Sequence, residues 1–433
     1  MRKPANFPVN LVIWIYSIIF TICLPFLFLR LWYRSRKNPE YRHHWLQRLG
    51  IFQVPPSLNK HGLWIHAVSV GESIAAVPLI QAFQQQFPHL SVTVTTTTPT
   101  GKAEIKRRFG DTVFHVYFPY DLPLAFATFL KKIQPKLCVL METELWINAL
   151  RSMKQYQIPC IVVNGRLSQK SMQGYKKIAM ITRDMFHNIQ HVVAQSEEDG
   201  RRFVDLGLDK NRLTIGGNVK FDCKLLEVVE DELSGLQIQW GRERPVIVAA
   251  STHAGEEIEI LGAYSELKKE FKDLLLILVP RHPDRFNSVA NEIKKRNFNF
   301  VRRSQATVCD PRTEIFLGDS MGELALFYQA AHIAFVGGSL VPVGGHNTLE
   351  PASVGLPIIV GPYTYNFNEI TKLMLEAGGL KQVPDKNALL FCLQKWLREP
   401  DIAKHIGACG KKVVLENKGA VDKIFTHIKS YFL

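Results

Sequence analysis

Short apolar segments rich in β-branched residues recur along most of the chain, and segments with a helical spacing of apolar residues lie between them. In the first half, the apolar segments predict strands at residues 63–67, 91–97, 112–117, 137–141, 160–164, 191–194 and 213–215. In the second half, they predict strands at residues 246–250, 274–279, 298–302, 314–317, 333–336 and 357–360. Strands that alternate with helices are typical of parallel sheets covered by helices. The pattern therefore predicts an α/β protein with two doubly wound, Rossmann-like domains.

The N-terminal segment has a different pattern, because no charged residue occurs from Phe7 to Leu29. This is roughly the length of a helix that spans a bilayer. Basic residues are more numerous after the segment than before it, and those that follow are Arg30, Arg34, Arg36, Lys37, Arg42 and Arg48. The positive-inside rule then predicts a membrane anchor with the body of the protein in the cytoplasm. A cleaved signal peptide is the alternative, but the apolar run is long for one and no small-residue cleavage site follows. Pro25 leaves shallow insertion open as an alternative to full spanning.

The alternation of strands and helices is interrupted at residues 224–244, which we interpret as a linker. A chain of 433 residues is also too long for one hydrophobic core. We therefore expect an anchor with its basic flank at 1–35, an N-terminal domain at 36–223 and a C-terminal domain at 245–433. Ligands of doubly wound sheets bind at the carboxyl ends of the strands. We accordingly expect the functional site in a cleft that both domains face.

The composition, with 46% hydrophobic and 21% charged residues, is that of a globular protein. A formal net charge of +14 is compatible with nucleic acid, an anionic membrane surface or acidic substrates as partners. No basic run with interleaved aromatic residues resembles a nucleic-acid-binding module, so we expect no nucleic-acid partner. The seven cysteines are scattered and form no C-x-x-C pair, which indicates reduced thiols in the cytosol and neither disulfides nor a zinc site.

Charged side chains follow several predicted strands of the first half. Glu72 comes directly after Gly71, near the start of a helix predicted at 73–85, and Glu142 and Glu144 follow the strand at 137–141. Each is a candidate general base, the group that removes a proton from an attacking hydroxyl. For Glu72, a structural role as a helix-start carboxylate is an equally good interpretation. Lys220 stands just before the linker, where its ammonium group can reach a phosphate.

A glycine-rich stretch in the second half is the most distinctive loop. Gly337 and Gly338 end a predicted strand, and a second glycine pair precedes Asn347 and Glu350, which have the spacing of a capping box. Unpaired N–H groups and a helix N-terminus favour an anion there, so we expect a phosphate site; a tight turn capped by Asn347 is the alternative. Further strand-end loops occur at residues 250–257, 279–285 and 318–324, and the second of these loops contains Arg281.

Taken together, these loops resemble those of one known family. The motifs that carry the resemblance occur in this order: HAVSVGE, TTTTPTG, METELW, NGRLS, GNVKFD, STHAGEE, VPRHP, GDSMGEL, FVGGSL, GGHNTLEP and GPYTYNF. Their set is similar to that of the bacterial 3-deoxy-D-manno-octulosonic acid (Kdo) transferases of lipopolysaccharide synthesis, over nearly the whole chain. Ile147 and Thr348 depart from the family pattern, which has proline there, and neither is an expected catalytic group.

The resemblance implies a GT-B fold and an inverting transfer of Kdo from CMP-Kdo to a lipid A precursor (lipid IVA) at the cell inner membrane, without cofactor or metal. Position by position, Glu72 corresponds to the general base, and Glu142 and Lys220 to groups that support the transition state. The positions around CMP correspond to Pro280, Arg281, Met321, Gly322, Glu323, Asn347, Thr348, Leu349 and Glu350. Two alternatives remain: a nucleotide-sugar epimerase or hydrolase of the same fold, and a membrane-anchored binding protein without activity.

Overall fold

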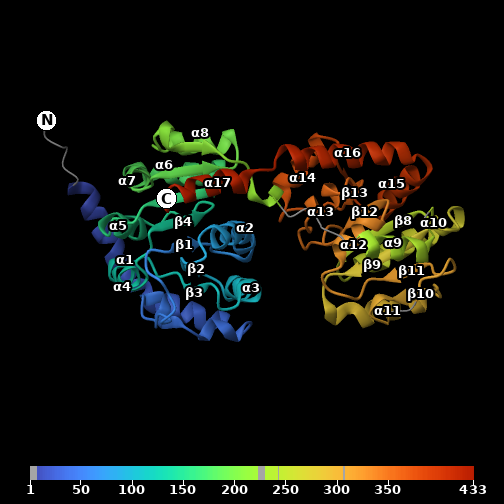
Figure 1. Cartoon of the computed structure of the whole chain (residues 1–433), viewed down its shortest axis with the longest axis horizontal. Coiled ribbons are helices and arrows are strands. Elements are labelled where there is room, and N and C mark those ends of the chain that lie inside the picture. Colours follow the sequence, from blue (N-terminus) through green and yellow to red (C-terminus); the bar gives the residue numbers. More distant parts are fainter. Residues whose placement is uncertain (1–6, 223–229, 242, 306–307) are drawn as a thin grey trace. The chain divides into compact units, whose positions relative to one another are not determined.

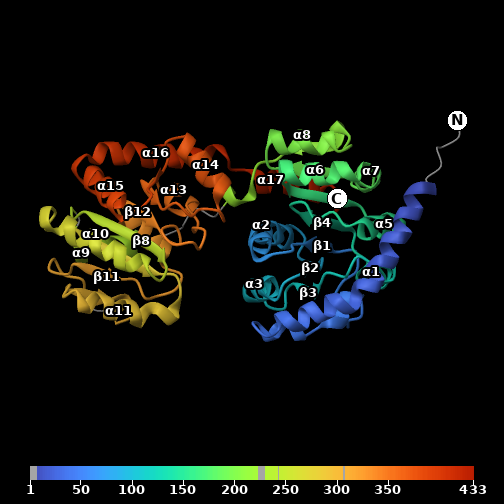
Figure 2. The ribbon, with the colours of Figure 1, turned by 180° about the vertical axis from the view of Figure 1, so that it is seen from behind.

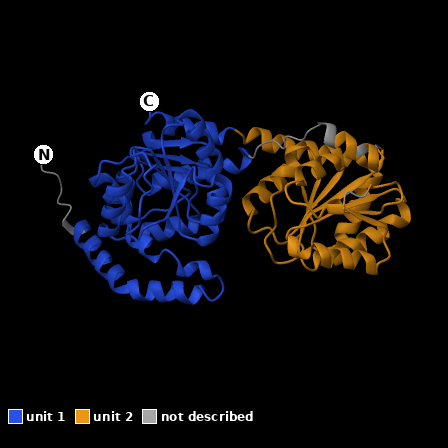
Figure 3. Cartoon of the chain, turned by 60° about the horizontal axis from the view of Figure 1, so that its bottom comes forward, with its two compact units in different colours: residues 1–222, 419–433 blue, residues 223–418 orange. Residues whose placement is uncertain are grey.

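The computed structural model describes residues 7–222, 230–241, 243–305 and 308–433. The chain forms two compact units, shown in different colours in Figure 3. Unit 1 comprises Met1–Asp222 and Gly419–Leu433, and unit 2 comprises Cys223–Lys418. Each unit contains a seven-stranded sheet whose neighbouring strands are all parallel, flanked by helices (Figures 1 and 2). The predicted fold class, two doubly wound α/β domains of the GT-B type after an apolar N-terminal helix, is thereby confirmed.

The sheet of unit 1 has the strand order β3-β2-β1-β4-β5-β6-β7. Its strands are β1 Leu63–His66, β2 Val92–Thr96, β3 Phe114–Tyr117, β4 Leu137–Met141, β5 Cys160–Gly165, β6 His191–Ala194 and β7 Leu213–Ile215. All of them were predicted, because each is a short, buried, β-branched run. From β1 the chain builds the sheet first in one direction and then, from β4 on, in the other. The strand order therefore reverses between β1 and β4, which is where such sheets place their ligands.

The two faces of this sheet carry separate apolar cores, because successive side chains of a strand point to opposite faces. Leu63 and Ile65 lie in one core, and Trp64 lies in the other. The first core is covered by α2 Val70–Gln86, α3 Pro99–Phe109 and α17 Ala420–Lys429. The second is covered by α4 Pro123–Ile133, α5 Ile147–Gln155, α6 Gln169–Lys177, α7 Ala179–His187 and α8 Glu197–Asp205. Both faces are buried, as expected for a parallel sheet.

The last helix, α17, lies in unit 1, whereas the sequence placed residues 245–433 together in a C-terminal domain. In Figure 1 the red α17 lies among the blue and green elements of unit 1. Ile424 and Ile428 are buried in the core beneath α2. The Asp222 carboxylate accepts hydrogen bonds from the N–H groups of Gly419 at 2.6 Å and Val421 at 2.5 Å, which caps the helix. The apolar spacing of α17 predicts a helix with one buried face but carries no information about which core receives that face.

The sheet of unit 2 has the order β10-β11-β9-β8-β12-β13-β14, so its strand order reverses between β8 and β12. Its strands are β8 Val246–Thr252, β9 Leu275–Pro280, β10 Phe300–Arg302, β11 Ile315–Leu317, β12 Ile333–Val336, β13 Ile358–Val360 and β14 Lys381–Gln382. Its helices are α9 Glu230–Trp240, α10 Glu256–Glu270, α11 Phe286–Lys295, α12 Leu324–Ala330, α13 Leu349–Ser353, α14 Asn368–Glu376, α15 Lys386–Arg398 and α16 Pro400–Glu416. Of the strands, β14 was not predicted, since a two-residue strand leaves no periodicity to detect.

The interpretation of residues 224–244 as a linker is wrong for its second part. Helix α9 lies there, and its side chains Leu236 and Trp240 are buried in a core of unit 2, where Trp240 packs against Phe316. The predicted linker residues 224–229 and 242 lie outside the described residues. A short helix that buries only one or two large side chains was indistinguishable in sequence from a connecting segment.

Helix α1, Phe7–Arg34, lies lengthwise on unit 1 and continues through Pro25. Near its two ends Ile13 and Leu31 are buried. Between them, the Tyr16 hydroxyl donates to Asp121 Oδ2 at 3.0 Å and Phe28 packs against Tyr120. The opposite face exposes large apolar side chains, among them Trp14, Ile18, Ile22 and Phe26. Among the described residues, α1 is the only helix long and apolar enough to cross a membrane, with a mean hydropathy of 2.4 over its apolar window.

Candidate active site

Three carboxylates come from the two strand ends that flank the switch in strand order of unit 1. Glu72 lies in the first turn of α2, directly after β1, and Glu142 and Glu144 lie in the loop after β4. Because β1 and β4 are adjacent and parallel, these strand ends meet at one edge of the sheet. The structure therefore brings together the acidic residues that the sequence had singled out in two separate motifs.

Glu72 is buried and held in one orientation by its own helix start. Its Oε2 accepts a hydrogen bond from the Val68 N–H at 2.9 Å, and its Oε1 accepts from the Ser69 hydroxyl at 2.9 Å. The Ser69 Oγ accepts in turn from the Glu72 N–H at 3.4 Å, which completes a capping box. The sequence predicted a helix from residue 73, but α2 begins at Val70. The Ser-x-x-Glu spacing of Ser69 and Glu72 was the overlooked signal.

The electrostatics of this site bring the pKa of Glu72 close to neutral pH. Burial raises the pKa of Glu72 to about 7, with further increases from the charges of Glu142 and Glu144, while the hydrogen bonds from Val68 and Ser69 act in the opposite direction. Burial also raises the pKa of Glu144, against the hydrogen bond that Trp146 Nε1 donates to it at 3.1 Å. A carboxylate with a pKa near the working pH is matched to general-base catalysis.

The backbone at two neighbouring strand ends is strained. Glu142, directly after β4, has φ +56°, and Asn164, the second-last residue of β5, has φ +54°. Residues other than glycine rarely adopt this left-handed conformation, which costs on the order of 1 kcal/mol or more and tends to occur at functional sites. The left-handed conformation of Glu142 turns the chain immediately after β4. This turn sets the direction of the loop that carries Glu142 and Glu144.

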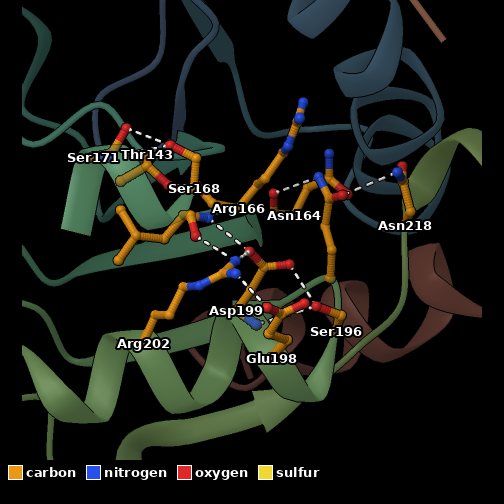
Figure 4. A network of polar contacts seen from close by, with 12 residues as sticks. Thr143, Asn164, Arg166, Ser168, Ser171, Ser196, Glu198, Asp199, Arg202 and Asn218 are labelled. Carbon is orange, nitrogen blue, oxygen red and sulfur yellow. Dashed lines mark hydrogen bonds and ion pairs between the residues drawn. The ribbon is translucent and has the colours of Figure 1, made fainter. Parts of the chain in front are cut away.

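The loop after β5 carries a cation, Arg166, and Figure 4 shows the polar contacts around it. Asp199 Oδ1 accepts from the Leu167 N–H at 2.8 Å, and Arg202 Nη1 donates to the Leu167 carbonyl at 2.8 Å. The Thr143 hydroxyl donates to the carbonyl of Arg166. With its backbone fixed on both sides, Arg166 extends its exposed side chain away from Asp199 (Figure 4). The sequence analysis did not name Arg166, although the motif NGRLS contains it.

Lys220 is brought to the same edge of the sheet by hydrogen bonds of its own segment. It lies in the short 3-10 helix Val219–Asp222, after β7. Asn164 Oδ1 accepts from the Val219 N–H at 3.1 Å, and Asn218 Oδ1 accepts from the Lys220 N–H at 3.0 Å. The strained Asn164 thus ties the end of β5 to the segment that carries Lys220.

In unit 2, the strand ends around the switch in strand order carry Arg281, Asn347 and Glu350. Pro280 ends β9, and Arg281 follows it with an exposed side chain, its N–H bonded to the Thr252 carbonyl at 3.0 Å. Asn347 and Glu350 follow β12 on the other side of β8. Burial raises the pKa of Glu350, while the hydrogen bond from Asn347 and the charge of Arg281 lower it. Arg281 and Glu350 are therefore close enough to influence each other across this edge.

The first part of the glycine-rich loop does not offer free donors to a phosphate, because the protein's own Glu256 carboxylate binds the N–H groups of residues 338–340. Glu256 is fully buried and accepts from the N–H groups of Gly338 at 2.7 Å, Ser339 at 2.9 Å and Leu340 at 2.9 Å. It also accepts from the His253 N–H at 2.9 Å. Burial raises the pKa of Glu256 although these four N–H groups favour its ionised form. These backbone N–H groups, which we expected to bind a ligand, therefore form hydrogen bonds within the protein.

The capping box expected at Asn347 and Glu350 is also different. Helix α13 begins at Leu349 and has five residues, and its N-cap Thr348 makes no side-chain capping bond. Asn347 instead accepts from the Leu349 N–H at 3.0 Å and donates to Glu350 Oε1 at 3.0 Å. The side chains of Thr348 and Leu349 are buried, and among the residues that the structure describes the Thr348 hydroxyl has no hydrogen-bond partner. These two residues can meet a ligand only through their backbone.

The segment Met321–Glu323 follows β11, the neighbour of β9. Met321 is exposed, and Gly322, at φ +91°, has open space where a side chain would be. Glu323 Oε1 accepts from Arg303 Nη2 at 2.5 Å and from Arg303 Nε at 3.0 Å, which lowers the pKa of Glu323. The Glu323 carboxylate therefore organises its own loop. In the part of the chain that the structure describes, no group of three or more His, Cys, Asp or Glu side chains is placed to hold a metal ion.

Comparisons with known proteins show which family the chain resembles. Residues 43–223 match the family model described as 3-deoxy-D-manno-octulosonic-acid transferase (kdotransferase). The chain is 41% identical to the 3-deoxy-D-manno-octulosonic acid transferase of Haemophilus influenzae over 417 residues, which is 96% of this chain and 98% of the relative. It is 33% identical to the enzyme of the same name from Bordetella pertussis, over 96% of this chain and 99% of the relative.

Solved structures with low sequence identity share the fold alone. A UDP-N-acetylglucosamine 2-epimerase superposes with a TM-score of 0.53 at 15% identity, over 86% of this chain and 97% of its own. A glycosyltransferase from Rickettsia africae superposes with a TM-score of 0.54 at 13% identity, over 86% of this chain and 99% of its own. With full-length relatives at 41% and 33% identity, the chain belongs to the family of 3-deoxy-D-manno-octulosonic acid transferases, which are glycosyltransferases.

Proposed function

We propose that the enzyme transfers Kdo from CMP-Kdo to a hydroxyl of a lipid A precursor, with inversion at the anomeric carbon and with neither cofactor nor metal. The observation that carries this proposal is the buried Glu72, oriented by Ser69 and Val68 and with a pKa of about 7. Such a carboxylate can accept the proton of a sugar hydroxyl. Arg281, in unit 2, is a cation suited to the phosphate of the donor.

The proposed reaction is a single displacement. A sugar hydroxyl is a poor nucleophile, so Glu72 takes its proton while the oxygen forms a bond to the anomeric carbon of Kdo. The bond from this carbon to the phosphate oxygen breaks, and CMP leaves with the electron pair. Arg281 and Lys220 offset the charge that grows on the phosphate, and the Glu142 carboxylate offsets the positive charge that develops on the sugar ring. One base and no covalent intermediate are sufficient, and the configuration inverts.

An epimerase or hydrolase of nucleotide sugars is the second candidate, because a UDP-N-acetylglucosamine 2-epimerase shares the fold. Such enzymes need no lipid acceptor. The test is to incubate the protein with CMP-Kdo, with and without an acylated lipid A precursor, in the presence of a chelator. We expect CMP release to depend on the acceptor, and the mass spectrum of the lipid to gain Kdo. Release of CMP at the same rate without the lipid would support the epimerase or hydrolase instead.

Arg281→Ala and Lys220→Ala should each weaken the use of CMP-Kdo. A lost charge-assisted hydrogen bond to phosphate costs about 1.5–3 kcal/mol, which is roughly a 10- to 150-fold loss of kcat/KM. Arg312→Ala is the matched control, because Arg312 is exposed and pairs with Asp310 at the surface of unit 2. Steady-state kinetics over a range of CMP-Kdo concentrations decide. Variants indistinguishable from wild type at every concentration would remove both residues from the donor site.

We further propose that α1 holds the enzyme on the cytoplasmic face of the inner membrane by lying along the surface. Because Ile13 and Leu31 are buried near opposite ends of the helix, α1 is attached to unit 1 along its length. A helix in this position presents its exposed apolar face to a bilayer in the manner of an interfacial helix. The basic residues that follow it add attraction to anionic lipid headgroups.

Ile22→Asp combined with Phe26→Asp should release the protein from membranes, since both side chains are exposed on α1 and would place charges in the apolar part of the interface. Phe391→Asp is the control, because Phe391 is equally exposed but lies on α15 of unit 2. The measurement is the membrane-bound fraction after sedimentation without detergent. A wild-type protein that stays in the supernatant, or a double variant that still sediments, would contradict the proposal.

A further inference from the structure

Two histidines from different strand ends share a hydrogen bond in unit 2. The Nε2 atoms of His253 and His346 lie 2.8 Å apart, and the two rings are nearly parallel, with an interplanar angle of 11°. His253 follows β8 and His346 follows β12, so the pair bridges the switch in strand order, where a doubly wound sheet places its ligand. Neither histidine is among the residues carried over from the family.

The chemistry of imidazole limits how many protons this histidine pair can bind. In a hydrogen bond between two ring nitrogens, one donates an N–H and the other accepts with its lone pair. The neutral pair therefore presents one N–H and one lone pair at its two Nδ1 atoms. A single added proton leaves the shared bond intact and gives both Nδ1 atoms an N–H. The pair then becomes a cation with two outward donors, whereas a second added proton would set two N–H groups against each other.

The Glu256 carboxylate holds the backbone of both segments that carry the histidines. It accepts from the His253 N–H and from the loop that begins at Gly338. Gly338 packs directly under His346, because a Cβ atom added there would lie 3.1 Å from ring atoms of His346. The four groups that donate to this carboxylate in the described part of the chain are backbone N–H groups, and none is a ring nitrogen. Glu256 thus orients the pair and leaves the outward nitrogens to a ligand.

The other charged groups around the pair are mostly cationic. The charges of Arg281 and His282, which follow β9, lower the pKa of both histidines. The centre of the His282 ring lies 5.3 Å from that of the His253 ring. Arg285 also acts on His253, but Glu257 binds its guanidinium at 2.7 Å. Glu350 is the nearby carboxylate that faces Arg281.

Burial and this cationic surrounding keep the free pair neutral. Burial, followed by the charges of His282, Arg285 and Arg281, lowers the pKa of His253. Burial, followed by the charges of His253, Arg281 and His282, lowers the pKa of His346 to about 4. An anion placed among Arg281 and the histidines would reverse this repulsion, so the bound anion and the added proton favour each other.

We propose that His253 and His346 form, with Arg281, the subsite for the phosphate of the nucleotide, and that the pair takes up one proton from solvent when this anion binds. The inference rests on the proposed donor CMP-Kdo. The only bond formed in this step is an N–H bond, between a proton from solvent and the lone pair of the outward Nδ1; no bond of the ligand breaks. The charged pair interacts more strongly with the phosphate of departing CMP than with the less charged diester of the donor. It would therefore favour the charge that develops as the bond to the sugar breaks.

The test measures CMP binding by calorimetry between about pH 8 and about pH 6, in buffers of different ionisation enthalpy, for wild type and His346→Gln. CMP carries its own titrating phosphate, which is the same for both proteins and cancels in the comparison. We expect wild type to take up more protons than the variant, and the variant to bind CMP about tenfold more weakly near pH 6, the effect of one charge-assisted hydrogen bond. Cytidine, which lacks the phosphate, should bind both proteins equally.

His405→Gln serves as the control, because His405 is exposed on α16 of the same unit. His253→Gln breaks the pair from the other side and should reproduce the loss, so a folding defect of one variant does not prevent the test. Equal proton uptake and equal CMP affinity in wild type and both pair variants would overturn the inference while leaving CMP as the ligand. Absence of CMP binding by wild type would overturn the proposed donor itself.

Discussion

Replacing Glu72 with glutamine is expected to lower turnover by roughly 10²–10⁴-fold, the usual contribution of a general base. The amide is nearly the same size and can keep the hydrogen bond with the Ser69 hydroxyl, but it cannot accept a proton from the acceptor. Affinity for CMP should be nearly unchanged, because Glu72 is proposed to contact the acceptor hydroxyl and not the nucleotide. Turnover and CMP affinity are measured on the same purified variant.

The control for Glu72→Gln is Ser69→Ala, which removes the capping hydroxyl but leaves the carboxylate. Loss of the cap costs about 0.5–2 kcal/mol of stability, while turnover should fall far less than in Glu72→Gln. A glutamine variant that retains wild-type turnover and melts slightly earlier would make Glu72 a purely structural residue. The search for the base would then move to Glu142 and Glu144.

The pH dependence supplies a second readout for Glu72. Only the ionised carboxylate can act as a base, so turnover of wild type should rise as the pH increases through about 7. The folded carboxyl binds its proton more tightly than the unfolded one. Its contribution to stability is therefore present below the ordinary glutamate pKa and is lost as the pH rises through about 7. Melting temperatures of wild type should fall over this interval relative to those of Glu72→Gln, and parallel curves for the two proteins would contradict the raised pKa.

Replacing Glu256 with alanine is expected to have the largest effect on stability, a loss of roughly 3–5 kcal/mol. Four backbone N–H groups, two of them in fully buried hydrogen bonds, would lose their acceptor at once, and three of the four lie in the loop from Gly338 to Leu340. For a unit of this size, the melting temperature should fall by roughly 10 °C. The loop also positions His346, so CMP binding should weaken in the fraction that remains folded.

The matched control for Glu256→Ala is Glu259→Ala, on the same helix α10. Glu259 pairs with Lys386 at 3.2 Å in a half-exposed ion pair, and such pairs contribute about 0–1 kcal/mol. Thermal unfolding followed by circular dichroism compares the two. If Glu256→Ala melted within a degree or two of Glu259→Ala, water would be replacing the carboxylate, and the loop would not depend on it.

The local sequence pattern was sufficient to predict most helices and strands and to single out several candidate site residues. Strands such as β4 and β12 were predicted at their observed bounds, because a buried parallel strand is a short β-branched run ended by glycine or polar residues. The charge-free run from Phe7 to Leu29 likewise predicted a helix long enough to span a bilayer, and α1 lies there. Glu72 and Glu142 were singled out because each follows a predicted strand, and parallel strands expose their carboxyl ends at the same edge.

The assembly of each site depended on residues far apart in the chain, and only the tertiary structure decided it. Glu256 lies 82 residues from Gly338, whose N–H it binds, and His253 lies 93 residues from His346. The sequence predicted a glycine-rich loop with unpaired N–H groups. In the folded chain, the Glu256 carboxylate, which follows a neighbouring strand, accepts hydrogen bonds from three of these groups. The unit in which α17 packs could not be predicted for the same reason. An apolar face indicates that a helix is buried on one side, but which core receives that face depends on the folded chain.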